Sequence, residues 1–214
     1  MVRKIFWEDP YMTHLDATVT GVSGADITVD QTIFFAFSGG QESDRGRMGE
    51  YPVLGARKDG REIIYTLEEG HRLLPGDSVH MAIDWDRRYR LMRLHFAAEI
   101  ILELVYQHTP SIRKTGAHIA ADKARLDFEW QGNIAEIFPR LQKQADEIIA
   151  ADRTITSAFS DEAAEKRCWE IRGFARVPCG GTHLRRTGEV GAITLKRKNP
   201  GRGRERIEIH LSNT

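Results

Sequence analysis

Residues 87–106, RRYRLMRLHFAAEIILELVY, decide how the rest of the chain is interpreted. Apolar side chains recur in this stretch at steps of three and four residues, as they do along one face of an α-helix. They are Leu91, Leu94, Ala98, Ile101, Leu102 and Val105. Pro110 follows soon afterwards and cannot continue a helical hydrogen-bond ladder. The stretch therefore predicts one long amphipathic helix that ends within residues 107–110.

The chain before this helix has the pattern of a small β domain. Short runs rich in β-branched and aromatic residues are separated by Gly, Asp and Pro, and they lie at 15–22, 27–30, 32–35, 62–66 and 78–84. Many short strands at this spacing indicate an antiparallel barrel or sandwich. We expect a small antiparallel β-barrel domain over residues 1–86 and a second domain over residues 87–214.

The chain after the long helix mixes strands and helices, which indicates an α+β domain. The expected elements are a strand at 125–130, a helix at 133–151 interrupted near Pro139, a short helix at 161–169, and a closing hairpin at 189–198 and 204–211. The fold class expected for the whole chain is therefore α+β, with the β-barrel domain first.

Composition excludes several classes of protein. Of the 214 residues, 41% are hydrophobic and 29% are charged, as is typical of a soluble globular protein. No apolar run approaches the roughly 20 residues of a membrane helix, and the N-terminus lacks the apolar region of a signal peptide. The two cysteines are too few for a disulfide scaffold. We therefore expect a cytoplasmic protein that does not act at a membrane.

Positive charge is concentrated near the C-terminal end, although the formal net charge of the chain is +0. Between residues 185 and 206, only Glu189 and Glu205 oppose eight basic residues, which are Arg185, Arg186, Lys196, Arg197, Lys198, Arg202, Arg204 and Arg206. Such a block fits contacts with a phosphate backbone, and it fits equally well a solvated hairpin that is basic.

His95 and Glu99 stand four residues apart in the predicted helix, so both lie on one helical face. This is the arrangement of two metal ligands on a helix. The alternative interpretation is a hydrogen-bonded core histidine followed by a solvated glutamate. By itself, the pair does not decide between the two.

The sequence Cys179-Gly180-Gly181-Thr182-His183 is a second candidate for a metal site. Two glycines allow the chain to bend until the thiolate and the imidazole converge, and both groups are favoured zinc ligands. The backbone N–H groups of the turn could also bind an anion. The alternative is a buried cysteine near a surface histidine. The other cysteine, Cys168, has no such partner and is expected to be a small buried hydrophobe.

The sequence Ser38-Gly39-Gly40-Gln41 is the third feature. Its glycines let the backbone approach a ligand closely, and Gln41 offers both a donor and an acceptor. The alternative interpretation is a plain hairpin loop.

In this order, the motifs resemble the alanyl-tRNA editing family, which comprises the editing domain of alanyl-tRNA synthetase and its freestanding AlaX-type relatives. The resemblance covers nearly the whole chain. Residues 32–46 resemble the family's glycine-rich loop, usually G-G-G-Q, and residues 84–95 resemble the approach to its H-x-x-x-H helix. Residues 179–183 resemble its C-x-x-x-H motif, and residues 186–191 and 206–209 resemble its closing strands.

The resemblance implies a deacylase that hydrolyses the ester of a mischarged aminoacyl-tRNA in trans, with a two-layer α/β editing-type second domain. The implied substrate is tRNA for alanine carrying serine or glycine, and the implied cofactor is zinc. The zinc ligands would be His95, Glu99, Cys179 and His183. Glu99 and Gln41 are the candidate catalytic residues. The candidate substrate-binding residues are Ser38, Gly39, Gly40, Gln41 and Thr182, and the basic block would contact tRNA phosphates.

The chain departs from the family at two positions. Glu99 stands where the family usually has a histidine, and Phe96 stands where it usually has a threonine. A glutamate can bind zinc through oxygen, in which case a thiolate and a carboxylate together cancel the +2 charge of the ion. Alternatively, Glu99 acts as a base beside a three-ligand zinc, or the site of a divergent member holds no metal.

Two other functions are consistent with these residues. One is a catalytically weak tRNA-binding module, with Glu99 and Phe96 marking the loss of activity. The other is a metal-dependent hydrolase of small aminoacyl esters. Activity on mischarged tRNA separates the enzyme from the binding module, and activity on a minimal aminoacyl-adenosine ester identifies the small-substrate hydrolase.

Overall fold

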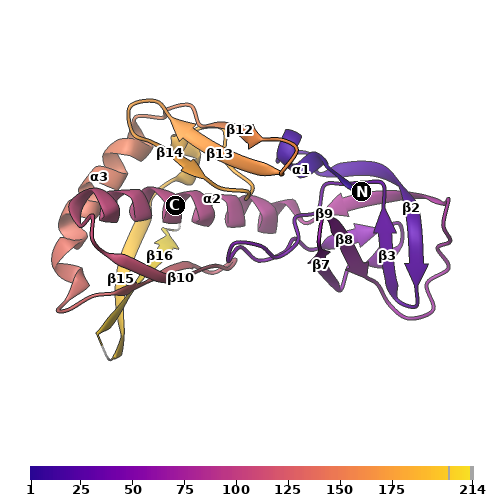
Figure 1. Ribbon diagram of the computed structural model, residues 1–214, viewed down its shortest axis with the longest axis horizontal. Coiled ribbons are helices and arrows are strands. Elements are labelled where there is room, and N and C mark those ends of the chain that lie inside the picture. Colours follow the sequence, from indigo (N-terminus) through magenta and orange to yellow (C-terminus); the bar gives the residue numbers. More distant parts are fainter. Residues whose placement is uncertain (202, 213–214) are drawn as a thin grey trace. The chain divides into compact units, whose positions relative to one another are not determined.

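The computed structural model describes residues 1–201 and 203–212, and its fold is mixed α/β with mostly antiparallel sheets (Figure 1). The chain forms two compact units: unit 1 comprises residues 1–38 and 42–89, and unit 2 comprises residues 39–41 and 90–214. The glycine-rich loop, expected in the first domain, thus has residues 39–41 in unit 2. The reason is backbone pairing with a distant part of the chain, since the Ile119 backbone N–H donates to the Gly40 carbonyl (2.8 Å) and Gln41 forms a parallel bridge with Ile119.

Unit 1 is built on a seven-stranded sheet in the order β6-β5-β9-β2-β3-β8-β7. The strands are β2 (His14–Ser23), β3 (Asp26–Val29), β5 (Gly46–Met48), β6 (Tyr51–Pro52), β7 (Gly55–Asp59), β8 (Glu62–Thr66) and β9 (Ser78–Ile83). Alternate residues of β9, such as Val79 and Met81, are buried, as expected for a sheet with one face on the core. The strands expected to form a barrel thus lie in one sheet, in which β6 and β7 are the outermost strands.

The remaining elements of unit 1 are β1 (Arg3–Lys4), α1 (Ile5–Glu8) and β4 (Gln31–Thr32), and β1 pairs with β4 in parallel. The strands expected near 15–22, 27–30, 62–66 and 78–84 are confirmed. Of the strand expected at 32–35, only Thr32 is part of a strand.

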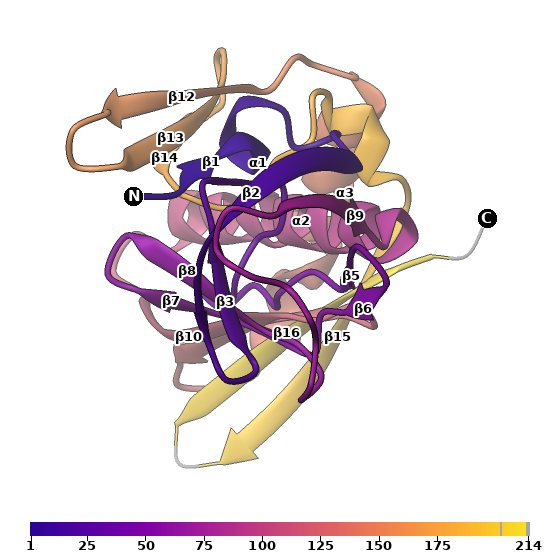
Figure 2. The same ribbon diagram turned by 90° about the vertical axis from the view of Figure 1, so that its right-hand side faces the viewer.

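The long helix is α2 (Trp85–His108), which confirms the helix predicted from residues 87–106. Its character differs from the prediction, because apolar residues are buried nearly all round it rather than on one face. Phe96, Ala97, Ile100 and Leu104 are buried as well as the predicted apolar positions. Figures 1 and 2 show the reason: the unit 2 part of α2 lies between two sheets. A helix covered on opposite sides requires apolar residues on both.

Unit 2 contains a four-stranded antiparallel sheet, β10-β11-β16-β15, and a three-stranded one, β12-β13-β14. The strands are β10 (Arg113–Ile119), β11 (Ala124–Glu129), β12 (Thr156–Asp161), β13 (Lys166–Ile171), β14 (Ala175–Pro178), β15 (Ile193–Gly201) and β16 (Arg204–Leu211). The helical segments are η1 (Ile134–Ile137), α3 (Phe138–Ala150) and η2 (Thr187–Val190). These bounds confirm the strand at 125–130, the helix divided near Pro139 and the closing hairpin, whose first strand begins at Ile193.

The short helix expected at 161–169 is wrong. These residues form the end of β12, a turn and the first part of β13. The Ala164 backbone N–H donates to the Asp161 carboxylate (3.0 Å), and Glu165 has φ of 53°, so the chain reverses tightly there. The buried Trp169 then lies in a strand, where the side-chain direction alternates between faces.

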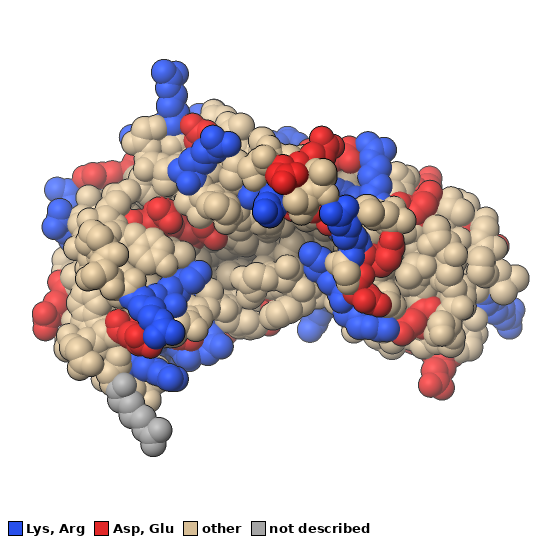
Figure 3. Space-filling model, in the orientation of Figure 1, with Lys and Arg blue, Asp and Glu red and all other residues tan. Residues whose placement is uncertain are grey.

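Three arginines of the basic block predicted near the C-terminal end form ion pairs with carboxylates. Arg186 pairs with Asp152 (2.6 Å), Arg197 pairs with Glu205 (2.6 Å), and Arg206 pairs with Asp127 (2.5 Å). Arg202 lies outside the described residues. Figure 3 accordingly shows Lys and Arg side chains next to Asp and Glu on the visible face.

No helix in the described part of the chain has the length and hydropathy that crossing a bilayer requires.

Candidate metal centre

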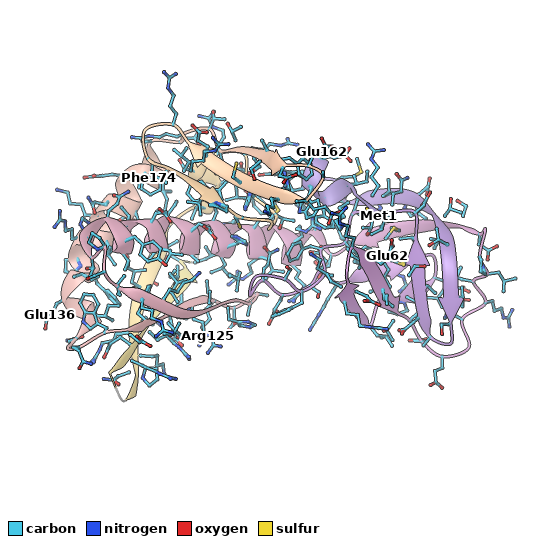
Figure 4. The ribbon with its side chains drawn as sticks, in the orientation of Figure 1. Met1, Glu62, Arg125, Glu136, Glu162 and Phe174 are labelled. Carbon is cyan, nitrogen blue, oxygen red and sulfur yellow. The ribbon has the colours of Figure 1, made fainter. Side chains whose placement is uncertain are left out.

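The two predicted metal motifs meet within unit 2. His95 lies on α2, and Cys179 and His183 lie on the segment that follows β14. Their ligand atoms all lie within 4.8 Å of one another, and Cys179 Sγ is 3.2 Å from His95 Nε2. Both histidines are buried, and Cys179 is half-buried. Side chains from α2 and from the β12-β13-β14 sheet fill the space between these elements (Figure 4).

Glu99 touches this group from the next turn of α2. Its Oε1 lies 3.4 Å from His95 Nε2 and 3.8 Å from Cys179 Sγ. Its other oxygen, Oε2, accepts a hydrogen bond from the indole N–H of Trp169 (3.1 Å). Glu99 is not a member of the mutually close group of three, so it stands beside two of its members.

The geometry fits a zinc ion. Zinc bonds of about 2.0–2.1 Å to nitrogen and about 2.3 Å to sulfur, arranged tetrahedrally, hold those two ligand atoms about 3.5 Å apart. His183 Nε2 is buried and has no hydrogen-bond partner among the described residues, while its Nδ1 lies 2.8 Å from Ser157 Oγ. A buried ring nitrogen without a partner is costly unless a ligand binds it. The donor set of imidazole, thiolate and carboxylate is one that zinc prefers.

Gln41 supports His95 from the glycine-rich loop. Its side-chain Oε1 lies 2.5 Å from His95 Nδ1, and its Nε2 donates to Thr182 Oγ1 (2.9 Å). A hydrogen bond at Nδ1 fixes the imidazole so that Nε2 faces Cys179, as metal-binding histidines commonly require. Both Gln41 and Thr182 are fully buried, at 0% and 1% exposure. The donor and the acceptor expected of Gln41 are both used by protein groups, and its direct contact with substrate stays a prediction.

Two glycines of these motifs are required by close packing. A Cβ at Gly181 would lie 2.2 Å from His95 Cε1, whereas one at Gly180 would meet nothing within 4 Å. Gly40 has φ of +88°, and a Cβ there would lie 2.6 Å from the Ala117 carbonyl oxygen. The loop and the turn therefore approach other atoms closely, as the sequence indicated. Ser38 belongs to unit 1, and its role and that of Gly39 in substrate binding stay predictions.

Electrostatics favour a bound cation. Burial by itself would raise the pKa of the Glu99 carboxyl. The hydrogen bond with His95, the charge of His95 and the hydrogen bond from the Trp169 N–H outweigh burial, so the pKa of Glu99 is lowered. Burial lowers the pKa of His95, and the charges of Cys179 and Glu99 outweigh burial and raise it. Burial, followed by the charges of His95 and Arg167, lowers the pKa of His183 well below its usual range. His183 is thus neutral near pH 7, the form in which imidazole binds a metal.

Sequence analysis missed two residues of this centre, Trp169 and Ser157. Trp169 is fully buried, and its ring centroid lies 5.2 Å from that of Phe96, which in turn lies 6.0 Å from the His183 ring. The error in assigning residues 161–169 to a helix hid this contact, because the direction of the Trp169 side chain follows from the alternation of side chains along a strand. Ser157 carried no signal, since one serine in an exposed strand resembles any other.

Comparisons with known proteins agree with these motifs. The family model "Threonyl and Alanyl tRNA synthetase second additional domain" matches residues 167–208, which include Cys179 and His183. Alanyl-tRNA editing protein AlaX-M of Pyrococcus horikoshii is 32% identical over 99% of this chain and 98% of its own length. The AlaX-M protein of Methanosarcina mazei is 32% identical over 99% and 97%.

A larger enzyme contains a similar segment. The alanine–tRNA ligase of Ignicoccus hospitalis is 31% identical over 90% of this chain, which corresponds to 24% of the ligase. The likeness to the AlaX-M proteins, by contrast, extends along nearly the full length of both chains. Because that likeness includes the segment carrying Cys179 and His183, the chain belongs to the alanyl-tRNA editing protein family, AlaX-M.

Proposed function

We propose that this chain is a zinc-dependent deacylase that hydrolyses, in trans, the ester bond of mischarged aminoacyl-tRNA. Its substrate is tRNA for alanine that carries serine or glycine. The observation that carries the proposal is the cluster of His95, Cys179 and His183, in which His183 Nε2 has no hydrogen-bond partner within residues 1–201 and 203–212. The AlaX-M relatives, named alanyl-tRNA editing proteins, supply the substrate class.

Each ligand has a supporting residue in this proposal. His95 Nε2, Cys179 Sγ and His183 Nε2 hold the zinc, and Glu99 Oε1 is the fourth ligand. Gln41 orients the His95 ring through Nδ1, and Ser157 orients the His183 ring through Nδ1. Such supporting contacts keep the ligand atoms aimed at one point before substrate arrives.

Zinc held by these residues would supply a Lewis acid for the ester carbonyl or for water. The charges of Cys179 and Glu99 cancel those of the ion, so the protein contributes mainly by holding the ester in place. The half-buried Cys179 is the open side of the cluster, where an ester can approach. Glu99 is also half-buried, but its Oε2 is held by the Trp169 indole N–H and its Oε1 lies next to His95 and Cys179, so it is better placed to bind the ion than to act as a base.

A tRNA partner requires positive charge that is not already neutralised. Arg186, Arg197 and Arg206 are paired with carboxylates. Lys196 and Lys198 on β15 and Arg204 on β16 are exposed. We assign these three residues to phosphate contacts, and tRNA binding should weaken with added salt because counterions are released.

The test is deacylation of tRNA for alanine charged with serine, glycine or alanine, together with metal analysis of the same protein. We expect one zinc per chain and hydrolysis of the seryl and glycyl esters, with the alanyl ester left intact. Binding of tRNA without hydrolysis would instead support the binding module. Equal rates on an aminoacyl-adenosine ester would support the small-substrate hydrolase.

A further inference from the structure

The two carboxylate oxygens of Glu99 have different neighbours. Oε2 accepts the hydrogen bond from Trp169 Nε1 (3.1 Å), while Oε1 lies next to His95 Nε2 (3.4 Å) and Cys179 Sγ (3.8 Å). The Trp169 N–H therefore determines which oxygen faces the metal ligands. Without it, rotation about the last side-chain bond would allow either oxygen, or both, to face them.

The indole N–H of Trp169 matches a carboxylate and does not match a histidine. Tryptophan only donates, so it needs an acceptor, and Oε2 is one. A metal-bound imidazole at position 99 would carry an N–H on its other nitrogen, and this group also needs an acceptor. Two donors would then face each other inside a buried site. Trp169 is thus suited to glutamate at position 99.

Phe96 fixes the Trp169 ring in this position. The two rings meet edge-on at 5.2 Å between centroids, and both side chains are fully buried. Phe96 and Glu99 are three residues apart on α2, so one helical face carries the carboxylate and the ring that holds its partner. Phe96 also lies 6.0 Å from the His183 ring and so packs against two parts of the centre.

We propose that Trp169 is a positioning residue that makes Glu99 a one-oxygen metal ligand. The inference rests on the proposed function, because it takes Glu99 as a ligand of the zinc. It adds that the residues 96, 99 and 169 act as one set, in which Phe96 holds Trp169 and Trp169 orients Glu99. Trp169 itself contacts neither the ion nor the substrate.

The first test is Trp169→Phe, which removes the N–H and keeps an aromatic ring. Zinc affinity, measured by competition with a chromophoric chelator, should fall by up to about tenfold, the lower end of the range that is typical when a partner of a metal ligand is lost. In cobalt-substituted protein, the absorption bands should change as Glu99 alters its binding mode. The matched control is Trp130→Phe, in the same unit, which should leave both readouts unchanged.

A second measurement separates positioning from a structural role. In a Glu99→Ala background, Trp169→Phe should weaken zinc binding no further, because its effect passes through the carboxylate. An equal loss in both backgrounds would overturn the inference and leave Trp169 a packing residue. Unchanged affinity in Trp169→Phe alone would overturn it as well.

A third measurement does not require the Trp169 variant to fold. The chain has four tryptophans, and the wild type should show one indole N–H resonance that is protected from exchange and moves when zinc is added. Glu99→Ala should abolish this response, and its persistence would overturn the inference. A wild type that binds zinc but hydrolyses no aminoacyl-tRNA would overturn the proposed activity and leave the role of Trp169 standing. A wild type that binds no zinc would overturn both.

Discussion

Two buried polar clusters use residues of α2, and they differ in how completely their hydrogen bonds are satisfied. In unit 1, Arg88 is fully buried and donates to both oxygens of Asp44 and to the carbonyls of Pro10 (2.8 Å) and Ile33 (2.5 Å). In unit 2, seven residues later in the sequence, His95 belongs to a cluster in which His183 Nε2 has no partner among the described residues.

The difference teaches how to separate a structural network from a site. The Arg88 guanidinium is surrounded by protein acceptors, so a ligand has no group left to bind there. The His95 cluster brings three ligand atoms within 4.8 Å and leaves one of them unsatisfied. Such an arrangement is stabilised when a cation binds. Burial alone does not distinguish the two clusters, whereas the list of partners does.

The largest expected effect concerns the structural network. Arg88→Met should lower the free energy of unfolding by about 3–5 kcal/mol, because the Asp44 carboxylate stays buried without its cation. Urea denaturation of the zinc-loaded protein measures the change. The double variant Arg88→Met with Asp44→Leu should be more stable than Arg88→Met alone. If the double variant is the less stable of the two, the hydrogen bond from the Phe35 backbone N–H is enough to stabilise the buried Asp44 carboxylate without Arg88.

Cys179→Ala tests the other cluster, and there we expect the loss of zinc and of activity. Loss of the zinc would disturb the positioning of the ester and remove the Lewis acid, so deacylation should fall at least about 10²- to 10³-fold. Bound zinc, measured by mass spectrometry, should fall with it. Cys168→Ala is the matched control, since Cys168 lies outside the cluster, and it should keep both zinc and activity.

Gly181→Ala tests whether the close approach of the turn to His95 is required. The added Cβ would lie 2.2 Å from His95 Cε1, so the ring must move, and zinc affinity should drop by about 10- to 100-fold. Gly180→Ala, one residue earlier, meets no atom within 4 Å and should bind zinc as the wild type does. Equal affinities for the two variants would show that the turn adjusts freely.

The smallest expected effect is that of Glu99→Gln, which removes the charge and keeps an oxygen acceptor for Trp169. As a ligand at the edge of the group, Glu99 should contribute about tenfold to zinc affinity. The rate of the zinc-loaded variant should be unchanged or higher, because the loss of a carboxylate leaves the centre more positive. A general base would behave differently, with zinc retained and a rate loss of about 10²- to 10⁴-fold.

Glu99→His sharpens the same point. An imidazole at this position presents an N–H to the Trp169 N–H, so Glu99→His alone should bind zinc no better than the wild type. The double variant Glu99→His with Trp169→Phe should bind zinc more tightly than Glu99→His alone, because the opposing N–H is gone. If Glu99→His alone binds zinc more tightly than the wild type, the Trp169 N–H does not require a carboxylate at position 99.

Part of the fold could be predicted because it depends on local periodicity. The 24 residues of α2 and the strand β16 follow patterns that span one element each. The same reasoning failed at residues 161–169, where the turn at Glu165 depends on a left-handed backbone and an Asp161 side-chain contact. It also described α2 as amphipathic, because a sequence pattern does not report how many sheets cover a helix.

The sequence by itself determined which side chains make up the candidate metal centre. His95 and Glu99 share a face because the helix repeats every 3.6 residues, and Cys179 and His183 converge because glycine permits the turn between them. Only the tertiary structure decided which residues support them. Gln41, Ser157 and Trp169 come from segments far from α2 in the chain, and their contacts depend on directional hydrogen bonds of about 3 Å. Such contacts form only once sheets and helix have packed, so no spacing along the chain encodes them.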